Sequence, residues 1–419
     1  MFDAKLKQLT SYMKLPIYAL ICIFAWIFIV PIALLLPRKK NWVAVIGRQE
    51  GKFLDNAKYF FLQASQDYPN KRFVFISEDK AVVALINSYG LEALPYPSFK
   101  SIIFLLRCRI FVVDEAAWFS KLRFFFLYGV TSVQLWHGIW CKYIELSKWQ
   151  HEQGNVSWSS AKFLLKLRLF LYRLTGRRMT YDVVVATSEF YKKEVFQPAF
   201  LSKRFLITGY PRNNFGLNLT GKYKDLAWSN IDTDISQKLT DWKSKNKTLV
   251  LIAPTFRDSG TMPMQITSQD LLLLNEFAVE NNYEFIFKLH PSDTSKDFLK
   301  SKHFHIYQRN ADIYPLFPYF DALISDYSSI TMDFLHCDKP ILFFIPENDT
   351  YIERDRQLQF DPKTMMPGLI SKNVNELISG LLAEIGEDNF KDDRQRLKQK
   401  AFDKVTQNKA VNDIIRVIN

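Results

Sequence analysis

Short segments rich in β-branched and aromatic residues alternate with amphipathic stretches along most of this 419-residue chain. The alternation is typical of βαβ units, in which a helix connects two parallel strands. Because helices cover both faces of a parallel sheet, the pattern predicts an α/β fold. Strands are expected at residues 42–46, 72–76, 110–114, 132–136, 183–186 and 205–208, and again at 248–253, 284–289, 304–307, 322–324 and 340–344. Helices are expected at residues 52–65, 81–89, 268–281, 329–336, 374–385 and 392–405.

The two series of strands are separated by a polar segment, residues 217–247, which is rich in Asp, Ser, Thr and Lys. At roughly 100 to 200 residues per domain, the chain has room for two domains. We expect an N-terminal Rossmann-like domain at 41–216, a linker at 217–247 and a C-terminal Rossmann-like domain at 248–419. Two such domains facing a cleft form the GT-B architecture, in which the second domain holds a donor nucleotide.

The composition supports a folded chain with an anionic partner. Hydrophobic residues make up 48% and charged residues 23%, which provides enough apolar surface for a core and excludes a disordered chain. Lysine and arginine exceed the acidic residues by 12, which favours a membrane surface, a nucleic acid or a phosphate-bearing substrate. No nucleic-acid motif accompanies the dispersed basic residues, so a nucleic-acid partner is not expected. The four cysteines lie far apart without metal-ligand spacing, which predicts a reducing compartment and no zinc site.

Residues 15–37 contain no charged side chain. As a helix these 23 residues would extend about 35 Å, enough for a hydrocarbon core of about 30 Å. Three basic residues follow at Arg38, Lys39 and Lys40, and a small-residue cleavage site is absent, so the segment is not expected to be a signal peptide. We therefore predict an N-terminal membrane anchor at residues 1–40; a buried core helix is the alternative.

The charges that flank this segment predict its orientation. Three lysines precede it, whereas five basic residues follow it by position 52, so the positive-inside rule favours a cytoplasmic location for the domains that follow the segment. We expect the membrane to be the plasma membrane. Pro31 divides the apolar run and removes a helical hydrogen bond. A kinked, re-entrant helix is therefore an alternative to a spanning one.

Polar residues that follow predicted strands are the candidate site, because ligands of open parallel sheets bind at the carboxyl ends of the strands. His137 and His290 each follow a strand, one in each half of the chain. Ser328 and Ser329 lie where a strand enters a helix, a suitable position for binding phosphate through backbone N–H groups and hydroxyls. The alternative for Ser328 is that its side chain only caps the helix.

Several motifs together resemble the CDP-glycerol glycerophosphotransferase family, which makes teichoic acids and related capsular polymers. The motifs are His137-Gly138 with Lys142, Gly209-Tyr210-Pro211-Arg212-Asn213-Asn214, Ala253-Pro254-Thr255-Phe256-Arg257-Asp258, His290-Pro291, and Ser325-Asp326-Tyr327-Ser328-Ser329 through Asp333 to Lys339-Pro340. The resemblance covers about residues 130–370 and includes Asp355-Arg356 and Pro367-Gly368. It implies a GT-B fold and transfer of a polyol phosphate, most simply glycerol phosphate, from a CDP-activated donor to an acceptor hydroxyl, with release of CMP.

The resemblance also implies the roles of individual residues. The catalytic residues are His137 and His290. His137 is the candidate base, because a histidine can accept the proton of the attacking hydroxyl. The donor-binding residues are Thr255, Arg257, Asp326, Ser328, Ser329, Asp333 and Arg356. The acceptor-side residues are Gly138, Lys142 and Arg212.

The sequence departs from the family pattern at Ile139-Trp140, where Thr-Pro is usual, at Asn214 for aspartate and at Gln357 for glycine. No metal ligands are assigned: the Asp232-Thr233-Asp234 run lies in the polar segment, where a solvated loop is expected. The expected partners are CDP-glycerol or CDP-ribitol as donor, a lipid-linked or polymeric acceptor, and membrane lipids. Two other functions fit the sequence. One is a GT-B glycosyltransferase that uses a nucleotide sugar, and the other is a membrane-tethered, non-catalytic binder of anionic polymer.

Overall fold

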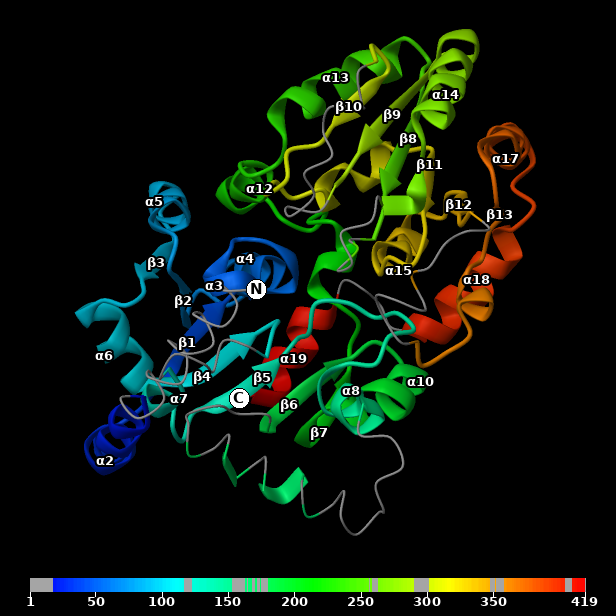
Figure 1. Cartoon of the computed structure of the whole chain (residues 1–419). Helices are drawn as coiled ribbons and strands as arrows, with labels where there is room; N and C mark the ends of the chain where they lie inside the picture. The colour runs from blue at the N-terminus through cyan, green and yellow to red at the C-terminus, as the bar shows by residue number, and fades with distance from the viewer. Residues whose placement is uncertain are drawn as a thin grey trace, which may run out of the picture.

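The computed structural model describes residues 18–116, 123–152, 163, 165–167, 170–171, 174, 180–255, 257, 263–289, 301–346, 351, 358–403 and 409–418. These residues form two α/β domains, each built on one parallel sheet (Figure 1). The predicted α/β fold with two Rossmann-like sheets is confirmed. Every predicted strand is present, with its ends shifted by at most a few residues.

The first domain contains a seven-stranded parallel sheet with the order β3-β2-β1-β4-β5-β6-β7. Its central strands are continuous apolar runs, as expected where helices cover both faces, and Val43 to Ile46 and Ile110 to Val113 are almost fully buried. The strands are β1 (Lys39–Ile46), β2 (Arg72–Ser77), β3 (Glu92–Pro95), β4 (Cys108–Val113), β5 (Thr131–Gln134), β6 (Thr180–Ala186) and β7 (Leu201–Ile207). The helices include α3 (Arg48–Gly51), α4 (Asp55–Asp67), α5 (Lys80–Ser88), α6 (Phe99–Arg107), α7 (Arg123–Phe126), α8 (Glu145–Glu152) and α10 (Glu189–Tyr191).

The second domain repeats this arrangement with the strand order β10-β9-β8-β11-β12-β13. In both sheets the order reverses beside the first strand of the domain, and this reversal creates a ligand-binding crevice at the carboxyl ends of the strands. The strands are β8 (Thr248–Ala253), β9 (Tyr283–Phe287), β10 (Phe304–Ile306), β11 (Ala322–Ser325), β12 (Ile341–Phe344) and β13 (Ile370–Ser371). The helices include α14 (Ser268–Asn281), α15 (Ile330–Phe334), α17 (Val374–Glu387) and α18 (Lys391–Phe402).

Two segments connect the domains. Residues 217–247, expected as a linker, contain helices α12 (Gly221–Trp228) and α13 (Thr233–Ser244); α12 contacts α4 and α13 contacts β8. At the end of the chain, helix α19 (Ala410–Ile418) returns to the first domain and contacts α4, although the sequence grouped residues 248–419 as one domain (Figure 1). The apolar face of α19 is buried there, so the first domain is completed by the C-terminal helix.

Residues Tyr18–Leu35 form a helix with a mean hydropathy of 2.7, which is long and apolar enough to cross a membrane by length and composition. Its course includes a π-helical turn (Ala25–Ile29) followed by α2 (Val30–Leu35), which carries Pro31 in its first turn. One side of the helix is buried through Cys22, Ala25, Val30 and Ala33, and α2 contacts α6 and α7. This helix therefore lies against the first domain.

Candidate active site

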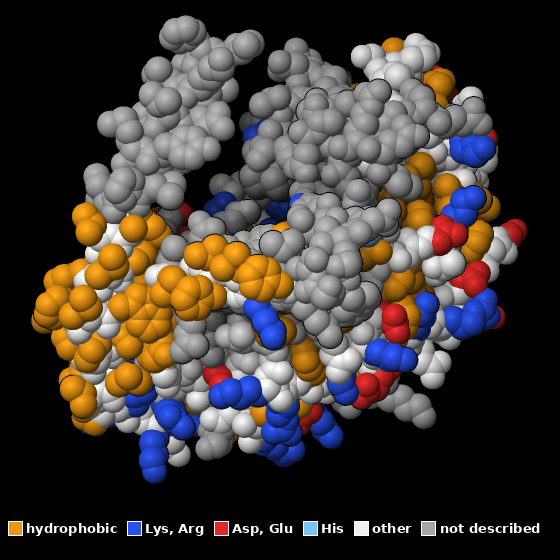
Figure 2. All heavy atoms as spheres, turned by 60° about the horizontal axis from the view of Figure 1, so that its bottom comes forward, with side chains coloured by type: hydrophobic (Ala, Val, Ile, Leu, Met, Phe, Trp, Pro, Cys, Tyr) orange, Lys and Arg blue, Asp and Glu red, His pale blue; other side chains and the backbone are white. Residues whose placement is uncertain are grey.

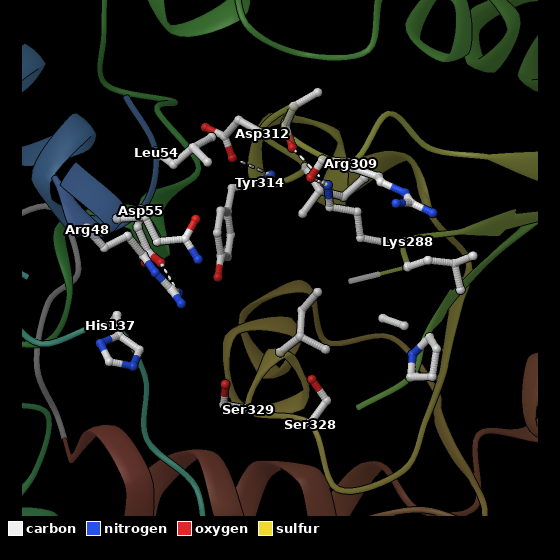
Figure 3. A pocket seen from close by; sticks show the side chains of 17 residues that line it. Arg48, Leu54, Asp55, His137, Lys288, Arg309, Asp312, Tyr314, Ser328 and Ser329 are labelled. Carbon is white, nitrogen blue, oxygen red and sulfur yellow. Dashed lines mark hydrogen bonds and ion pairs between the residues drawn. The ribbon is translucent and has the colours of Figure 1, made fainter. Parts of the chain in front are cut away.

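A cavity of about 260 Å³ lies between the two domains, at the carboxyl ends of their strands (Figure 3). Its first-domain wall is formed by residues that follow β1 and β5, and its second-domain wall by residues at or after the ends of β8, β9, β10 and β11. The polar side chains that line it are Arg48, Gln49, Asp55, His137, Lys288, Arg309, Asp312, Tyr314, Ser328 and Ser329. The reversed strand order of both sheets thus opens onto one shared site.

His137 is a half-buried residue at the end of β5 that faces this cavity. Its Nδ1 lies 3.1 Å from the carbonyl oxygen of Asp114. Because a carbonyl can only accept, Nδ1 carries the proton and Nε2 keeps a free lone pair. Desolvation, helped by the positive charge of Arg48, lowers the pKa of His137 to about 3. The imidazole is therefore a neutral proton acceptor.

The backbone before His137 adopts an unusual conformation that directs this side chain towards the cavity. Trp136 has a φ of 60°, in the left-handed region that large side chains rarely adopt. The Gln134 side chain accepts a hydrogen bond from the Trp136 N–H at 2.9 Å, and the Asn56 side-chain amide donates to the Trp136 carbonyl at 2.7 Å. These bonds hold the turn in place, and the Trp136 ring packs 4.2 Å from the imidazole.

Ser328 and Ser329 form the opposite part of the cavity, between β11 and α15. Ser329 occupies the cap position of α15 but makes no side-chain capping bond, and the N–H groups of Thr331 and Met332 bond to the carbonyls of Ser328 and Ser329 instead. Neither hydroxyl has a hydrogen bond to another residue within the described part of the chain. The hydroxyls thus remain available to a ligand, and the structure shows none of the capping bonds considered as the alternative.

Gly138 brings the two walls together. A Cβ atom at this position would lie 3.1 Å from the Ser329 hydroxyl oxygen, closer than most side-chain contacts. A side chain at residue 138 would therefore press on the Ser329 hydroxyl, where the His-Gly turn of the first domain approaches the serine loop of the second.

A buried ionic network centred on Arg212 lies next to this contact. Arg212 donates to both carboxylate oxygens of Asp333, at 3.1 and 2.7 Å, and to the His137 carbonyl at 2.8 Å; it also contacts the Asp55 carboxylate. Tyr314 donates to the same Asp333 carboxylate at 3.1 Å. Arg212 and Asp333 are both 1% exposed and do not line the cavity. Of the predicted acceptor-side and donor-binding residues, these two link the domains and support the His137 turn.

A second buried network contains Thr255, Arg257 and Asp326. The Asp326 carboxylate accepts from the Thr255 N–H at 2.8 Å and from Arg257 at 2.9 Å. Arg257 also lies 4.3 Å from the centre of the Tyr351 ring, with the Lys142 ammonium 5.2 Å from that ring. Lys142, predicted on the acceptor side, thus contacts the second domain, and its backbone pairs with Leu358. These residues do not line the cavity.

The predicted residues His290 and Arg356, together with Asp258 and Gln357, lie outside the described residues. The departures from the family pattern at Ile139, Trp140 and Asn214 are all buried. Asp232, from the Asp-Thr-Asp run, caps α13 by accepting from the Ile235 N–H at 3.1 Å. In the part of the chain that the structure describes, no group of three or more His, Cys, Asp or Glu side chains is arranged to hold a metal ion.

Sequence reasoning missed several residues of the cavity, notably Arg48, Lys288 and Tyr314. Arg48 and Lys288 follow β1 and β9 closely, so the strand-end criterion that found His137 also applies to them. Lys288 donates its three ammonium protons to the carbonyls of Gln308, Arg309 and Ala311, at 3.0, 2.9 and 3.0 Å. Burial lowers its pKa to about 8. Lys288 therefore holds the segment after β10 that carries Tyr314 into the site.

Two Rossmann-like domains that meet at one cavity are the arrangement of GT-B-like enzymes. The sequence model of the CDP-glycerol:poly(glycerophosphate) glycerophosphotransferase family matches residues 28–419. The chain belongs to this family, as its motifs indicated, and is a CDP-glycerol glycerophosphotransferase-like enzyme of teichoic acid and cell-wall biosynthesis.

Known proteins similar to the chain agree with this assignment. It is 25% identical to a teichoic acid poly(glycerol phosphate) polymerase of Bacillus spizizenii over 83% of this chain and 84% of that protein. It is also 25% identical to a teichoic acid ribitol-phosphate primase of the same organism, with 82% of each covered. Two longer relatives come from Bacillus subtilis, and the chain spans 44% and 40% of their lengths. The structure of the wall teichoic acid polymerase TagF matches the fold with a TM-score of 0.68 at 18% identity, covering 100% of this chain and 97% of that one.

Proposed function

We propose that the enzyme transfers a polyol phosphate, with glycerol phosphate as the first candidate, from a CDP-activated donor to the hydroxyl of a lipid-linked or polymeric acceptor. The observation that carries this proposal is the placement of neutral His137 and the hydroxyls of Ser328 and Ser329 on opposite walls of one cavity. The site thus offers a proton acceptor on one side and phosphate-binding groups on the other.

In the proposed reaction, the acceptor hydroxyl attacks the phosphorus that carries the polyol. A new P–O bond to the acceptor forms, the P–O bond that links the two phosphates breaks, and CMP leaves with that bridging oxygen. The hydroxyl proton passes to Nε2 of His137, which is free because Nδ1 bonds to the Asp114 carbonyl. The negative diphosphate raises the pKa of a nearby imidazole, opposing the effect of Arg48 when the donor is bound.

The hydroxyls of Ser328 and Ser329 bind the diphosphate in this proposal. His290 and Arg356, which the family resemblance places on the donor side, complete the donor site. Arg257 and Asp326 support this site from behind the cavity wall rather than through direct contact, because their side chains are 1% and 0% exposed.

Nucleotide release from purified enzyme tests the proposal and its alternative. We expect CMP from CDP-glycerol or CDP-ribitol in the presence of an acceptor, and a product larger by one polyol phosphate. Release of CDP or UDP from a nucleotide sugar would instead identify a glycosyltransferase, which shares the GT-B fold. A protein that binds anionic polymer without any nucleotide release would be a non-catalytic binder.

We further propose that the enzyme lies on the cytoplasmic face of the plasma membrane, with helix Tyr18–Leu35 parallel to the surface. The side of this helix that faces away from the domain exposes apolar side chains, and a second group extends the same face (Figure 2). These side chains, here called the apolar face, are Leu20, Ile21, Ile23, Phe24, Ile27, Phe28, Ile32, Leu34 and Leu35, with Phe163, Leu167, Phe170, Leu171 and Leu174. The Trp26 indole donates to the Leu174 carbonyl at 3.1 Å and joins the two groups.

The opposite side of the helix is fixed to the first domain. Trp26 packs edge-on against Phe124, Phe125 and Tyr128, with ring centres 5.4 to 6.0 Å apart. Arg38 at the end of the helix donates to four backbone carbonyls, including that of Tyr128 at 2.6 Å. A helix held in this way along one side presents its other side to lipid, which supports in-plane attachment over a span. The lysines that follow the helix favour the anionic cytoplasmic leaflet.

A further inference from the structure

Arg48 occupies a turn that is built to place one side chain in the cavity. The turn follows β1, and Gln49, Glu50 and Gly51 have φ values of 50°, 69° and 95°. A Cβ atom at Gly47 would lie 2.0 Å from the Lys52 carbonyl oxygen, so only glycine fits there. Glu115 accepts from the Gln49 N–H at 2.9 Å, and the Glu50 carbonyl accepts from the Glu78 N–H at 2.9 Å. The turn is therefore held rigidly from two sides.

The Arg48 guanidinium is available to an anion. It donates to the Asp55 carboxylate at 3.2 Å, and it makes no other hydrogen bond to a residue among those described. Its side chain is 32% exposed. Asp55 also pairs with Arg212, so this carboxylate is divided between two guanidinium groups. The charge of Arg48 also acts on the Asp114 and Glu115 carboxyls, whose pKa values are raised by burial. Lys288 contrasts with it, because all of that ammonium group's protons are bonded to backbone carbonyls.

Arg48 lies on the same wall as the base. Figure 3 shows its side chain reaching from the first domain towards the space beside His137, across from Ser328 and Ser329. The positive charge of Arg48 helps to lower the pKa of the His137 imidazole and so opposes its protonation. An anion that contacts Arg48 is thus next to the hydroxyl that His137 deprotonates and lies on the acceptor side of the cavity.

We propose that Arg48 binds the acceptor's terminal phosphate, the one nearest to the attacking hydroxyl, and so selects acceptors that already end in a polyol phosphate. This inference rests on the proposed function. In a polyol phosphate chain the last phosphate and the free hydroxyl are separated by only a few carbons, so a guanidinium beside the base can contact the former while the base contacts the latter. Guanidinium is well suited to phosphate because it donates two parallel hydrogen bonds.

Two synthetic acceptors test the proposal in the full-length enzyme. One ends in a single glycerol phosphate unit, and the other presents the same terminal hydroxyl without phosphate. For Arg48→Gln we expect kcat/KM to fall about ten- to a hundredfold with the phosphorylated acceptor, less than threefold with the other, and CDP-glycerol affinity to stay unchanged. Arg48→Lys keeps the charge and loses the paired geometry, so its loss is expected to be intermediate. Arg204→Gln, at an exposed position on β7, is the matched control.

Other outcomes overturn the assignment. Weaker CDP-glycerol binding together with an equal loss for both acceptors would mean that Arg48 contacts the donor's phosphate. An equal loss with normal donor binding and a shifted pH profile would mean that Arg48 acts only on the charge state of His137. If wild-type enzyme releases CMP but Arg48→Gln behaves like Arg204→Gln, this inference fails and the proposed function stands. If wild-type enzyme releases no CMP from either CDP-polyol, the proposed function itself fails.

Discussion

Arg212 of the first domain and Asp333 of the second form a doubly bonded ion pair, 121 residues apart in sequence and closed to solvent. A second buried pair, Lys58 with Asp312 at 2.6 Å, joins the same two domains. The carbonyl of His137 is also a partner of Arg212. The position of His137, the proposed base, therefore depends on how the domains meet, and the two ion pairs hold the domains together.

Removing one charge from the first pair should be costly. Asp333→Asn removes one of the carboxylates that neutralise the buried Arg212, and we expect the free energy of unfolding to fall by about 3–5 kcal/mol. Urea denaturation measures this loss. Asp234→Asn, which breaks an exposed pair with Lys238, is the control and should cost at most about 1 kcal/mol. Similar losses in both variants would show that the buried pair does not hold the domains.

Replacing His137 should separate chemistry from donor binding. His137→Ala removes the proton acceptor but leaves the wall that carries Ser328 and Ser329 intact. We expect CMP release with acceptor to be lost and the calorimetric affinity for CDP-glycerol to remain near that of the wild type. A parallel loss of donor affinity would contradict the assignment of His137 to the acceptor side.

The charge state of His137 should also be visible directly. Because burial lowers its folded-state pKa to about 3, below the ordinary value near 6.5, the unfolded chain binds more protons between these values. The contribution of this residue to stability is thus present above about pH 6.5 and is lost progressively as the pH falls towards 3. In isotope-labelled protein we expect the NMR chemical shifts of the His137 ring to stay constant from pH 8 to pH 5. The signals are assigned by their absence from the spectrum of His137→Gln. A midpoint near 6.5 would rule out the desolvated imidazole.

The strands and the position of His137 after one of them could be predicted because their signals are local. Continuous apolar runs such as residues 43–46 and 110–113, rich in β-branched residues, are typical of strands buried on both faces, and a polar residue after such a strand, such as His137, is a candidate for the ligand edge. The edge strands β3 and β13 were missed because they have only four and two residues. Helices α12 and α13 were missed because their mostly polar sequences resemble a linker, although such sequences also form surface helices.

The parts that depend on the meeting of the domains could not be predicted. Arg212 and Asp333 carry no sequence signal that pairs them, since the match arises only when two separate sheets face each other. The spacing of apolar residues in α19 predicts that one side of this helix is buried, but it does not predict that this side packs on α4 of the first domain. Arg48 was passed over because a single arginine after a strand is common, and only its unused donors within the cavity distinguish it.

Ser329 should affect donor binding rather than folding. Its hydroxyl makes no capping bond, so Ser329→Ala is expected to change the melting temperature little. Loss of a hydrogen bond to a charged phosphate should weaken CDP-glycerol binding by roughly 1.5 to 3 kcal/mol, about ten- to a hundredfold. Ser188→Ala is the matched control, since that side chain does cap α10 at 3.1 Å: it should cost about 0.5 to 2 kcal/mol of stability and leave donor affinity unchanged. Equal donor affinity in Ser329→Ala and wild type would remove the serine loop from the site.

The depth of helix Tyr18–Leu35 in a bilayer should distinguish in-plane attachment from a span. Leu20, Ile27 and Leu34 are spaced by seven residues and are 66%, 58% and 59% exposed on the apolar face. A fluorophore on a cysteine introduced at each position should be quenched to the same shallow depth by lipids brominated along their chains. A spanning helix instead places residue 27 deeper than the other two by about 10 Å. Labelling is selective because Cys22, Cys108 and Cys141 are buried and Cys337 is partly buried, and a label at Leu272 on α14 of the second domain should remain in water.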